Sequence, residues 1–406
     1  MWWTVIVDEN VIFVVMRHFA LILAAFAALS CGPRPKEETM TQLAERVFRL
    51  ASRQTIYMDS LLSARQQAPD AVLCPRTFQG DSLVTSDIGW WCSGFYPGVL
   101  WQVYEYSGDE TFKALAVKHT RPLEALLGRE TDHDIGFQLM SSFGRMARDT
   151  GDPSCGSILR AGARTLTARF VPEAGVLRSW NGSRWTIPVI IDNMMNLELL
   201  MDYGDREVAE KHALTTARNH FREDGTTFHL VDYDYDGAIL GRQTVQGYAD
   251  NSAWARGQAW ALYGYAMMAR KEREAGNAAL AKTFYDIAAK LEGWILPRLP
   301  EDGVPYWDFS QTDYRDASAG AIIASALLDL HAFRNGGPDD PALKTAEKIL
   351  RTLASPDYLS EPGTNGGFLL RHSVGSLPGN SEVDVPLTYA DYYFLEALLA
   401  FPENGR

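Results

Sequence analysis

The feature that most constrains the fold of this chain is a spacing of three and four between apolar residues, which recurs along most of its length. Twelve segments show this helical periodicity, and each is about as long as an ordinary helix of a globular protein. They lie near residues 41–65, 94–106, 109–128, 135–149, 153–170, 193–203, 206–221, 253–274, 277–298, 317–334, 341–355 and 388–401. The sequence therefore predicts an all-α fold.

Five of the joints between these segments are short and share a pattern in which Gly precedes Asp or Asn. The four close copies and one looser copy are Ser107-Gly108-Asp109, Thr150-Gly151-Asp152, Tyr203-Gly204-Asp205, Ala275-Gly276-Asn277 and Asn335-Gly336-Gly337. Gly supplies the left-handed residue that ends one helix, and the Asp or Asn can cap the next. A turn this short makes the two helices antiparallel, so the joints predict a series of helical hairpins.

The remaining connections are long and rich in Gly, Pro and aromatic residues. They cover residues 66–93, 171–192, 222–252, 299–316 and 356–387. Short turns on one side and long loops on the other predict a closed ring of hairpins whose long loops line one mouth, where functional residues usually gather. An open solenoid is the alternative. It needs polar terminal repeats, whereas the last segment, YADYYFLEALLAF, is apolar.

Composition and charge narrow the class of protein. The 406 residues are 46% hydrophobic and 22% charged, which is typical of a globular protein with a large core. The net charge of −13 argues against nucleic acid as a partner, because no basic face is available to neutralise phosphates. An anionic ligand would have to be held by a few local cations.

The first 40 residues predict targeting rather than fold. A basic start at Met16 precedes the apolar run FALILAAFAAL, which is too short to span a bilayer, and small residues then lead to Cys31. We expect residues 1–30 to be a signal peptide with its true start at Met16, 31–40 a tether lipidated on Cys31, and 41–404 the helical domain. The expected location is the periplasm or cell surface, with membrane contact only through the lipid. An ordinary secretory signal is the alternative.

The other three cysteines, Cys74, Cys92 and Cys155, form no C-x-x-C pair and indicate neither a disulfide framework nor a zinc site. They are expected to be small buried side chains.

Asp192 is unusual because it lies inside an apolar run, VIIDNMMN. An ionised carboxylate in such surroundings is costly unless it has partners. One interpretation is an N-cap for the helix that begins at Asn193. The other is a general acid/base whose pKa is raised by its Ile and Met neighbours. The two are compatible.

Asp134, in TDHDIGF, has the same position before a helix and the same two interpretations, with Asp132 and His133 beside it. Two carboxylates at the mouth-side starts of two helices form the kind of pair used in sugar chemistry, provided that their surroundings keep their pKa values apart.

Aromatic residues are concentrated in the long loops and in the helix starts beside them: Trp90, Trp91, Phe95, Trp254, Trp260, Tyr306 and Trp307. Helical aromatic side chains are more often core than ligand contacts, whereas those in GWWCSGFYPG are better candidates for stacking on a sugar ring. Arg256 can either clamp a carboxylate or pair with a nearby Asp.

Several other chemistries find no support in the sequence. It contains no G-x-S-x-G elbow, no H-E-x-x-H helix and no phosphate-binding Gly-rich loop. The run DYDYDG begins like a calcium loop but has Gln243 where the bidentate Glu belongs, so we interpret it as a solvated acidic loop. No cofactor or metal is expected.

Five longer runs, in order, resemble glycoside hydrolase family 88, the unsaturated glucuronyl hydrolases. They are DHDIGF, IIDNMMN, QGYADNSAWARGQAW, YWDF with YRDASA, and SEVDVPLTYADYYFLEAL, and the similarity covers nearly all of residues 41–402. The resemblance implies an (α/α)6 barrel of six helical hairpins. It also implies substrates left by polysaccharide lyases, with a 4,5-unsaturated uronic acid at the non-reducing end, which the enzyme hydrates at the C4=C5 bond.

The resemblance assigns roles to individual residues. Asp192 corresponds to the general acid/base, and Asp134 to a second essential Asp. Residues around the unsaturated sugar correspond to Trp91, His229, Gln246, Trp254, Arg256 and Trp260.

Val245 departs from the family pattern, because many relatives have His where this chain reads TVQGY. A Val side chain neither titrates nor donates a hydrogen bond, so we expect a neighbouring sugar or sulfation pattern that differs from that of relatives with His. The alternatives are an unsaturated rhamnogalacturonyl hydrolase acting on pectin fragments and a non-catalytic glycan-binding lipoprotein in which the Asp pair only caps helices.

Overall fold

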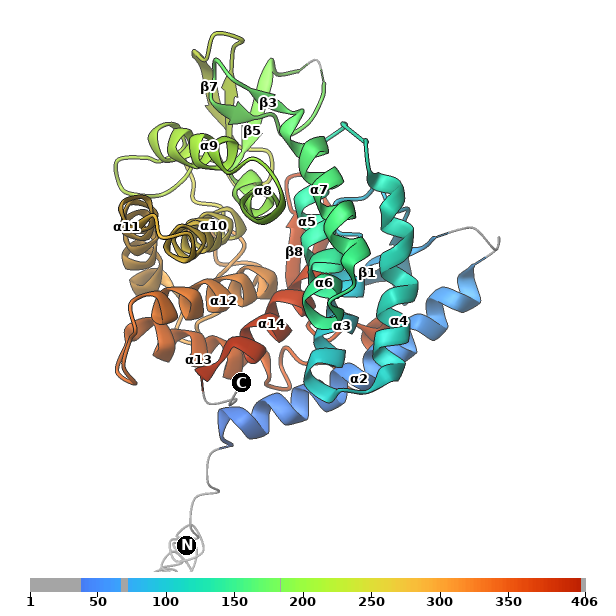
Figure 1. The fold of residues 1–406 in the computed structure, drawn as a ribbon. Coiled ribbons are helices and arrows are strands. Elements are labelled where there is room, and N and C mark those ends of the chain that lie inside the picture. Colours follow the sequence, from blue (N-terminus) through green and yellow to red (C-terminus); the bar gives the residue numbers. More distant parts are fainter. Residues whose placement is uncertain (1–37, 67–71, 183, 403–406) are drawn as a thin grey trace, which may run out of the picture. The chain divides into compact units, whose positions relative to one another are not determined.

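The structure is a computed structural model that describes residues 38–66, 72–182 and 184–402 (Figure 1). Contacts within the chain separate residues Met1–Thr39 from a compact unit, Met40–Arg406. The predicted signal peptide and Cys31 lie outside the described residues. None of the helices in the described part of the chain is long and apolar enough to cross a membrane.

Helices dominate the compact unit, as the periodicity predicts. They are α2 (Met40–Arg65), α3 (Phe95–Ser107), α4 (Glu110–Thr120), α5 (Ile135–Leu139), α6 (Arg145–Thr150), α7 (Pro153–Thr167), α8 (Leu197–Tyr203), α9 (Arg206–Asn219), α10 (Ala255–Glu274), α11 (Ala278–Ile295), α12 (Ala317–Phe333), α13 (Pro341–Leu353) and α14 (Thr388–Ala400). A π-helical turn, η2 (Met140–Gly144), joins α5 to α6, and a 3-10 turn, η3 (Ile191–Asn196), leads into α8. Counting α5–η2–α6 as one element leaves twelve helices between residues 38 and 402, in agreement with the sequence analysis.

Six of these helices form an inner ring. In order around the ring they are α3, α5–η2–α6, η3–α8, α10, α12 and α14, and each contacts the next. The ring closes because α14 packs on α3. The closed barrel is therefore confirmed, and the open solenoid is excluded.

The outer helices α4, α7, α9, α11 and α13 each follow an inner helix through one of the five short joints. The sixth outer helix is α2, which packs against α3 and α14 (Figure 1). The sixth pair of inner and outer helices, α14 with α2, is therefore formed by the two ends of the compact unit rather than by consecutive segments.

Side-chain caps in the short joints agree with the prediction. Asp109, Asp152, Asp205, Asn277 and Asp340 each accept a hydrogen bond from a backbone N–H in the first turn of the helix that follows.

The expectation of a left-handed Gly is correct at Gly108, Gly151 and Gly276 but wrong at Gly204, whose φ is −133°. At Gly204 the cause is space, since a Cβ would lie 2.8 Å from the Cβ of Ala163. Close packing of α8 on α7 therefore requires this glycine.

Short antiparallel strands occupy the long loops, and they were not predicted from the sequence. They are β1 (Cys74–Gln79) with β2 (Ser82–Ser86), β3 (Phe170–Val171) with β4 (Val176–Leu177), β5 (Ile187–Ile190) with β6 (Leu230–Tyr233) and β7 (Ile239–Gln243), and β8 (Ser373–Ser376) with β9 (Ser381–Val385). The sheet β5–β6–β7 ties the loop before α8 to the loop before α10. The fold remains all-α, with strands that fix the loops of one mouth.

The three cysteines of the described residues are free and buried, as predicted.

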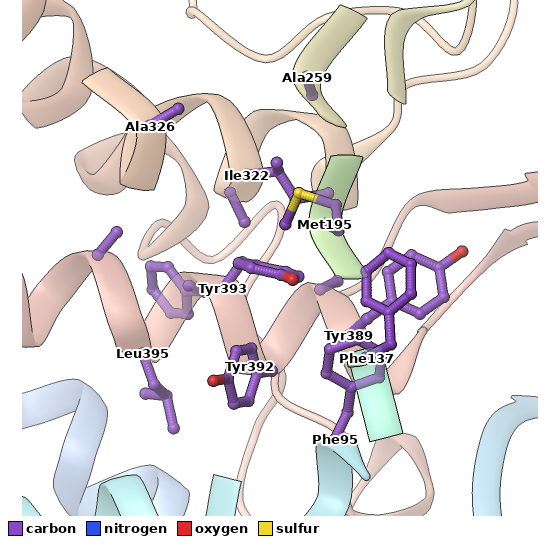
Figure 2. Close-up of a cluster of buried hydrophobic side chains, with 14 of the residues drawn as sticks. Phe95, Phe137, Met195, Ala259, Ile322, Ala326, Tyr389, Tyr392, Tyr393 and Leu395 are labelled. Atoms are coloured by element: carbon purple, nitrogen blue, oxygen red, sulfur yellow. The ribbon is translucent and has the colours of Figure 1, made fainter. Parts of the chain in front are cut away.

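Aromatic side chains fill the centre of the barrel. Figure 2 shows the cluster formed there by Phe95, Phe137, Tyr389, Tyr392 and Tyr393. Neighbouring ring centroids lie 5.0 to 6.0 Å apart in tilted or edge-to-face geometry. Burying one such side chain stabilises the fold by roughly 1.5–3 kcal/mol.

Candidate active site

Each of the five long loops precedes an inner helix, and the shorter connection 127–134 precedes the sixth, α5, so all six inner helices begin at the same end of the barrel. The predicted site residues gather at these starts. Trp91 precedes α3, Asp134 precedes α5, Asp192 lies in η3, and Trp254 with Arg256 begins α10. Residues far apart in sequence are thereby brought to one mouth, which confirms the prediction that the long loops line it.

A cavity of about 690 Å³ lies at the opposite end, between the C-terminal ends of the inner helices. Its charged side chains are engaged with one another: Arg145 lies 3.1 Å from Glu396, and Arg270 lies 3.1 Å from Asp329. The described residues that line this cavity include none of the predicted site residues.

Asp192 does not cap a helix. It lies within η3, whose N-cap position is Ile190 with no side-chain hydrogen bond, so the capping interpretation is wrong for this residue. The Asp192 side chain is 13% exposed, and its Oδ2 has no hydrogen-bond partner among the described residues. Burial raises its pKa to about 7, against the opposing effects of the Arg256 charge and the Trp260 indole. A carboxyl group with this pKa can donate and recover a proton near neutrality.

Asp134 stands at the N-cap position of α5, but its side chain makes no capping hydrogen bond. Instead, Asp132 accepts a hydrogen bond from the Asp134 backbone N–H. Burial, together with the negative charges of Asp132 and Asp192, raises the pKa of Asp134 well above its usual range. The structure therefore brings the two predicted carboxyl groups within electrostatic reach of each other, in surroundings that favour the protonated form of both.

Space is tight where the two carboxyl segments meet. A Cβ on Gly136 would lie 2.5 Å from the Cα of Asn196, and the Phe137 N–H donates to Asn196 Oδ1. The start of α5 and the end of η3 are thus fixed against each other.

His229 faces Asp192, with Nε2 3.7 Å from Asp192 Oδ2. The backbone N–H groups of Val245 and Gln246 both donate to its Nδ1, at 2.9 and 3.3 Å. Burial lowers the pKa of His229 to about 3, so the ring is neutral and its single proton is on Nε2, directed at the carboxyl group. The Val245 side chain is 38% exposed and takes no part in this contact, which uses only its backbone.

Arg256 is buried and paired with Asp316, with Nη1 3.2 Å from Asp316 Oδ2. Its guanidinium also donates to the carbonyl oxygens of Val374 and Gly375 in β8. These contacts use three of its five N–H donors, so Arg256 anchors β8 and still has donors for a ligand. Gln246 Nε2 donates to Gly375 O as well, at 3.1 Å, and joins the loop before α10 to β8.

The predicted aromatic residues form the walls around these groups. Trp254 stacks beneath the Arg256 guanidinium, 4.5 Å from its carbon, and lies 4.8 Å from the His229 ring. Trp260 is fully buried on α10. Trp91 lies 4.7 Å from the ring of Tyr389, on the side of the mouth formed by α3 and α14.

Four further aromatic candidates lie elsewhere. Phe95 belongs to the central cluster, and the Trp307 indole donates to Asp313. Trp90 and Tyr306 stack with Arg76 and Arg315, respectively. Among the described residues, the close polar neighbours of the carboxyl pair are His133 and His229, and none of these four aromatic residues is one of them.

Three residues of the site were not predicted from the sequence. They are Asp316, which caps α12 and pairs with Arg256, Asn193, which follows Asp192, and Tyr389, which begins α14. Asp316 and Tyr389 lie within the quoted runs YRDASA and YADYYF, so their position before or in a mouth-side helix start was an available signal.

Buried polar atoms without a hydrogen-bond partner are unusual in a folded protein. Among the described residues, such atoms in side chains of this mouth include Asp192 Oδ2, His229 Nε2, Trp260 Nε1 and Tyr389 Oη. Donors and acceptors left open in one place suit a polar ligand with several hydroxyl or carboxylate groups.

No family model matches the chain. It is, however, 41% identical over 323 residues to an unsaturated glucuronyl hydrolase of Formosa agariphila, covering 76% of this chain and 79% of the relative. A second unsaturated glucuronyl hydrolase, from Bacillus sp. strain GL1, is 35% identical over 333 residues, covering 76% of this chain and 85% of the relative.

A solved structure, that of an unsaturated glucuronyl hydrolase specific for heparin, superposes with a TM-score of 0.81 at 40% identity, covering 88% of this chain and 97% of the other. These relatives support the predicted glucuronyl hydrolase and neither the pectin-fragment hydrolase nor the non-catalytic binding protein. With its closed (α/α) barrel and paired carboxyl groups at one mouth, the chain belongs to the unsaturated glucuronyl hydrolase family of glycoside hydrolases.

Proposed function

We propose that the chain removes the 4,5-unsaturated uronic acid from the non-reducing end of oligosaccharides released by polysaccharide lyases, and that Asp192 is its general acid/base. The observation that carries the proposal is the Asp192 carboxyl group, buried, unpartnered at Oδ2 and with a pKa of about 7. A protonated carboxyl group is needed to protonate an alkene, and this one remains protonated up to neutral pH.

The reaction is the addition of water across C4=C5. Asp192 gives its proton to C4 and then takes one from the water that adds at C5. The carboxyl group is therefore protonated again at the end of the cycle. The product is a hemiketal at C5, which opens to a ketone. This leaves a hemiacetal at C1, which collapses and releases the neighbouring sugar.

The neighbours of Asp192 suit the two halves of this cycle. While Asp192 is ionised, the Nε2–H of His229 and the positive charge of Arg256 stabilise it. The donors of Arg256 that β8 leaves open are available to the C6 carboxylate of the sugar. Trp91 and Trp254 supply flat surfaces on which a sugar ring can stack.

For substrates, we propose unsaturated disaccharides from glycosaminoglycans, with the heparin type first. The support is the 40% identity to the heparin-specific relative. Streptococcal relatives at 32–34% identity are named unsaturated chondroitin disaccharide hydrolases, so chondroitin disaccharides form the second arm of the test.

The test follows the ultraviolet absorbance of the conjugated alkene with unsaturated disaccharides from heparin, chondroitin, hyaluronan, ulvan and pectin. We expect loss of absorbance with at least one glycosaminoglycan disaccharide, and none with Asp192→Asn at the same protein concentration. Turnover by Asp192→Asn would remove this residue from the mechanism. Absence of turnover with every substrate, while calorimetry shows binding, would favour a binding protein.

A sulfur-linked unsaturated disaccharide distinguishes hydration from displacement at the anomeric carbon. A thioglycoside bond is a poor target for general-acid protonation, which direct displacement requires. Hydration at C4=C5 does not involve that bond until the later collapse. We therefore expect the oxygen- and sulfur-linked substrates to lose absorbance at comparable rates.

We also propose that the chain is an envelope lipoprotein anchored through Cys31. The support is the apolar run and the small residues before Cys31 in the sequence. Metabolic labelling with a fatty acid tests it: label should enter the wild-type chain and be lost in Cys31→Ser. Secretion of unlabelled wild-type protein would instead indicate an ordinary signal peptide.

A further inference from the structure

His133 lies beside the carboxyl pair and takes no part in the hydration cycle described above. Its side chain is 2% exposed, and its Nε2 lies 3.4 Å from Asp134 Oδ1. His229 stands in the same relation to Asp192, with Nε2 3.7 Å from Oδ2. Each carboxyl group of the site therefore faces the Nε2 of one histidine.

The partner of the other ring nitrogen, Nδ1, decides where the proton of each neutral histidine lies. In His229, Nδ1 accepts hydrogen bonds from two backbone N–H groups, and the proton is on Nε2. In His133, burial lowers the pKa of the imidazole, and the neighbouring Asn193 side chain opposes this shift as a hydrogen-bond acceptor.

The orientation of Asn193 supports this assignment. Its Nδ2 donates to the carbonyl oxygen of Leu177 at 2.8 Å, so its Oδ1 faces the other way. Asn193 Oδ1 and His133 Nδ1 are both buried, and neither atom makes a hydrogen bond within the described residues. A proton on His133 Nδ1 satisfies both atoms, whereas its absence would set two lone pairs against each other.

With its proton on Nδ1, His133 presents a bare lone pair at Nε2. Burial lowers the pKa of His133 to about 4, so the ring is neutral at working pH. A lone pair that faces an ionised carboxylate is repelled, whereas one that faces a carboxyl O–H accepts a hydrogen bond. The two histidines therefore favour opposite states of the two acids.

We propose that His133 is a positioning residue that keeps Asp134 protonated, so that Asp192 alone exchanges a proton during hydration of the substrate. The proposal rests on the proposed function and deepens it. Asp134 would then serve as a neutral group beside the sugar, with no negative charge to hinder ionisation of Asp192.

Other charged groups also act on the Asp134 carboxyl group. Asp132 and Asp192 favour protonation of Asp134, whereas Arg129 and Arg169 oppose it. The remaining neighbouring histidines, His212 and His229, are both neutral because burial lowers their pKa values to about 3. Within the described residues, none of them makes a hydrogen bond or ion pair with the Asp134 carboxyl oxygens, whose close polar neighbour is His133 Nε2.

The protonation of Asp134 can be read without any substrate. In the infrared spectrum of the full chain at about pH 8, the difference between wild type and Asp134→Asn should contain the C=O band of a protonated carboxyl group. We expect this band to be lost in His133→Gln, whose amide can turn a donor toward the carboxylate. It should also be lost in Asn193→Asp, where the new carboxylate makes the imidazole cationic and puts a proton on Nε2.

His212→Gln is the matched control. His212 is equally buried and lies near His133, but its Nδ1 accepts a hydrogen bond from the Leu177 N–H and it does not face Asp134. The Asp134 band should survive in this variant. Absence of the band in wild type, or its persistence in both His133→Gln and Asn193→Asp, would overturn the proposal.

The pH dependence of kcat/KM gives a second readout. In His133→Gln, an ionised Asp134 repels a second negative charge on Asp192. The alkaline limb of the kcat/KM profile should therefore move up by about one pH unit, which is roughly a tenfold rise in the proton affinity of Asp192. A merely structural role of His133 would lower the melting temperature and kcat without moving this limb, and would count against the proposal. If wild type turns over no unsaturated substrate, the proposed function fails, and the infrared test still decides the state of Asp134.

Discussion

Replacing Asp192 by Asn should abolish turnover and, above neutral pH, make the protein more stable. The pKa of this carboxyl group rises from 3.8 to about 7 on burial. Because the pKa is higher in the folded than in the unfolded chain, ionisation favours unfolding, and stability falls as the pH rises from about 4 to about 7 and is flat above. Three pKa units at about 1.4 kcal/mol each correspond to about 4 kcal/mol.

Asn has the same shape as Asp and does not ionise. It also loses little, because Asp192 Oδ2 has no hydrogen-bond partner among the described residues. At about pH 8 we expect Asp192→Asn to be more stable than wild type by up to about 4 kcal/mol, and at about pH 4 by less than about 1 kcal/mol. For a folded unit of about 360 residues, this gain is a rise in Tm of about 5 °C.

The assay is calorimetric or circular-dichroism melting of both proteins from pH 4 to 8. Asp391→Asn is the matched control, since burial raises the pKa of Asp391 to about 7 as well. Asp391, however, accepts hydrogen bonds from the backbone N–H groups of Leu369 and Leu370, and Asn would lose an acceptor there. Asp391→Asn should therefore gain no stability at pH 8. If Asp192→Asn is no more stable than wild type at pH 8, its carboxyl group does not resist ionisation, and the general-acid assignment loses its physical basis.

Three further substitutions test the surroundings of this carboxyl group. Asp316→Ala leaves the buried charge of Arg256 without its partner and should lower the free energy of unfolding by about 3–5 kcal/mol in a denaturant titration; a loss below about 1 kcal/mol would contradict the pairing. Trp260→Phe keeps a ring in the barrel centre but removes the indole that lowers the pKa of Asp192, so the alkaline limb of kcat should move up by about half a pH unit. Val245→His changes an exposed side chain and keeps the backbone donor, so kcat on the best substrate should stay within about twofold, while KM values for different neighbouring sugars should change order; a large loss of kcat would show that the side chain matters to the chemistry.

Local patterns predicted much of this protein correctly. The twelve helices, the short hairpin joints and the caps at Asp109, Asp152 and Asp205 follow from periodicity and from hydrogen bonds within a few residues. The closed ring also followed, because short and long connections alternate. The β-strands of the loops were missed, since runs of two to six residues carry too little periodicity to be distinguished from irregular structure.

The roles of individual polar side chains could not be read in the same way. A helix-start Asp caps more often than it reacts, and the sequence could not show that Asp192 lies inside η3 with no hydrogen-bond partner for its Oδ2 among the described residues. Nor could it show that Arg256 donates hydrogen bonds to Asp316 and to β8, which lies more than 100 residues away along the chain.

The sequence by itself determined the helices, the order of hairpins and the types of residue at the mouth, because these depend on neighbours along the chain. The tertiary structure decided which of those residues react. Closure of the ring buries Asp134 and Asp192 together and raises both pKa values, and it sets a histidine against each. Burial and the partner of a ring nitrogen are properties of the assembled barrel, and they turn two ordinary helix starts into an acid pair.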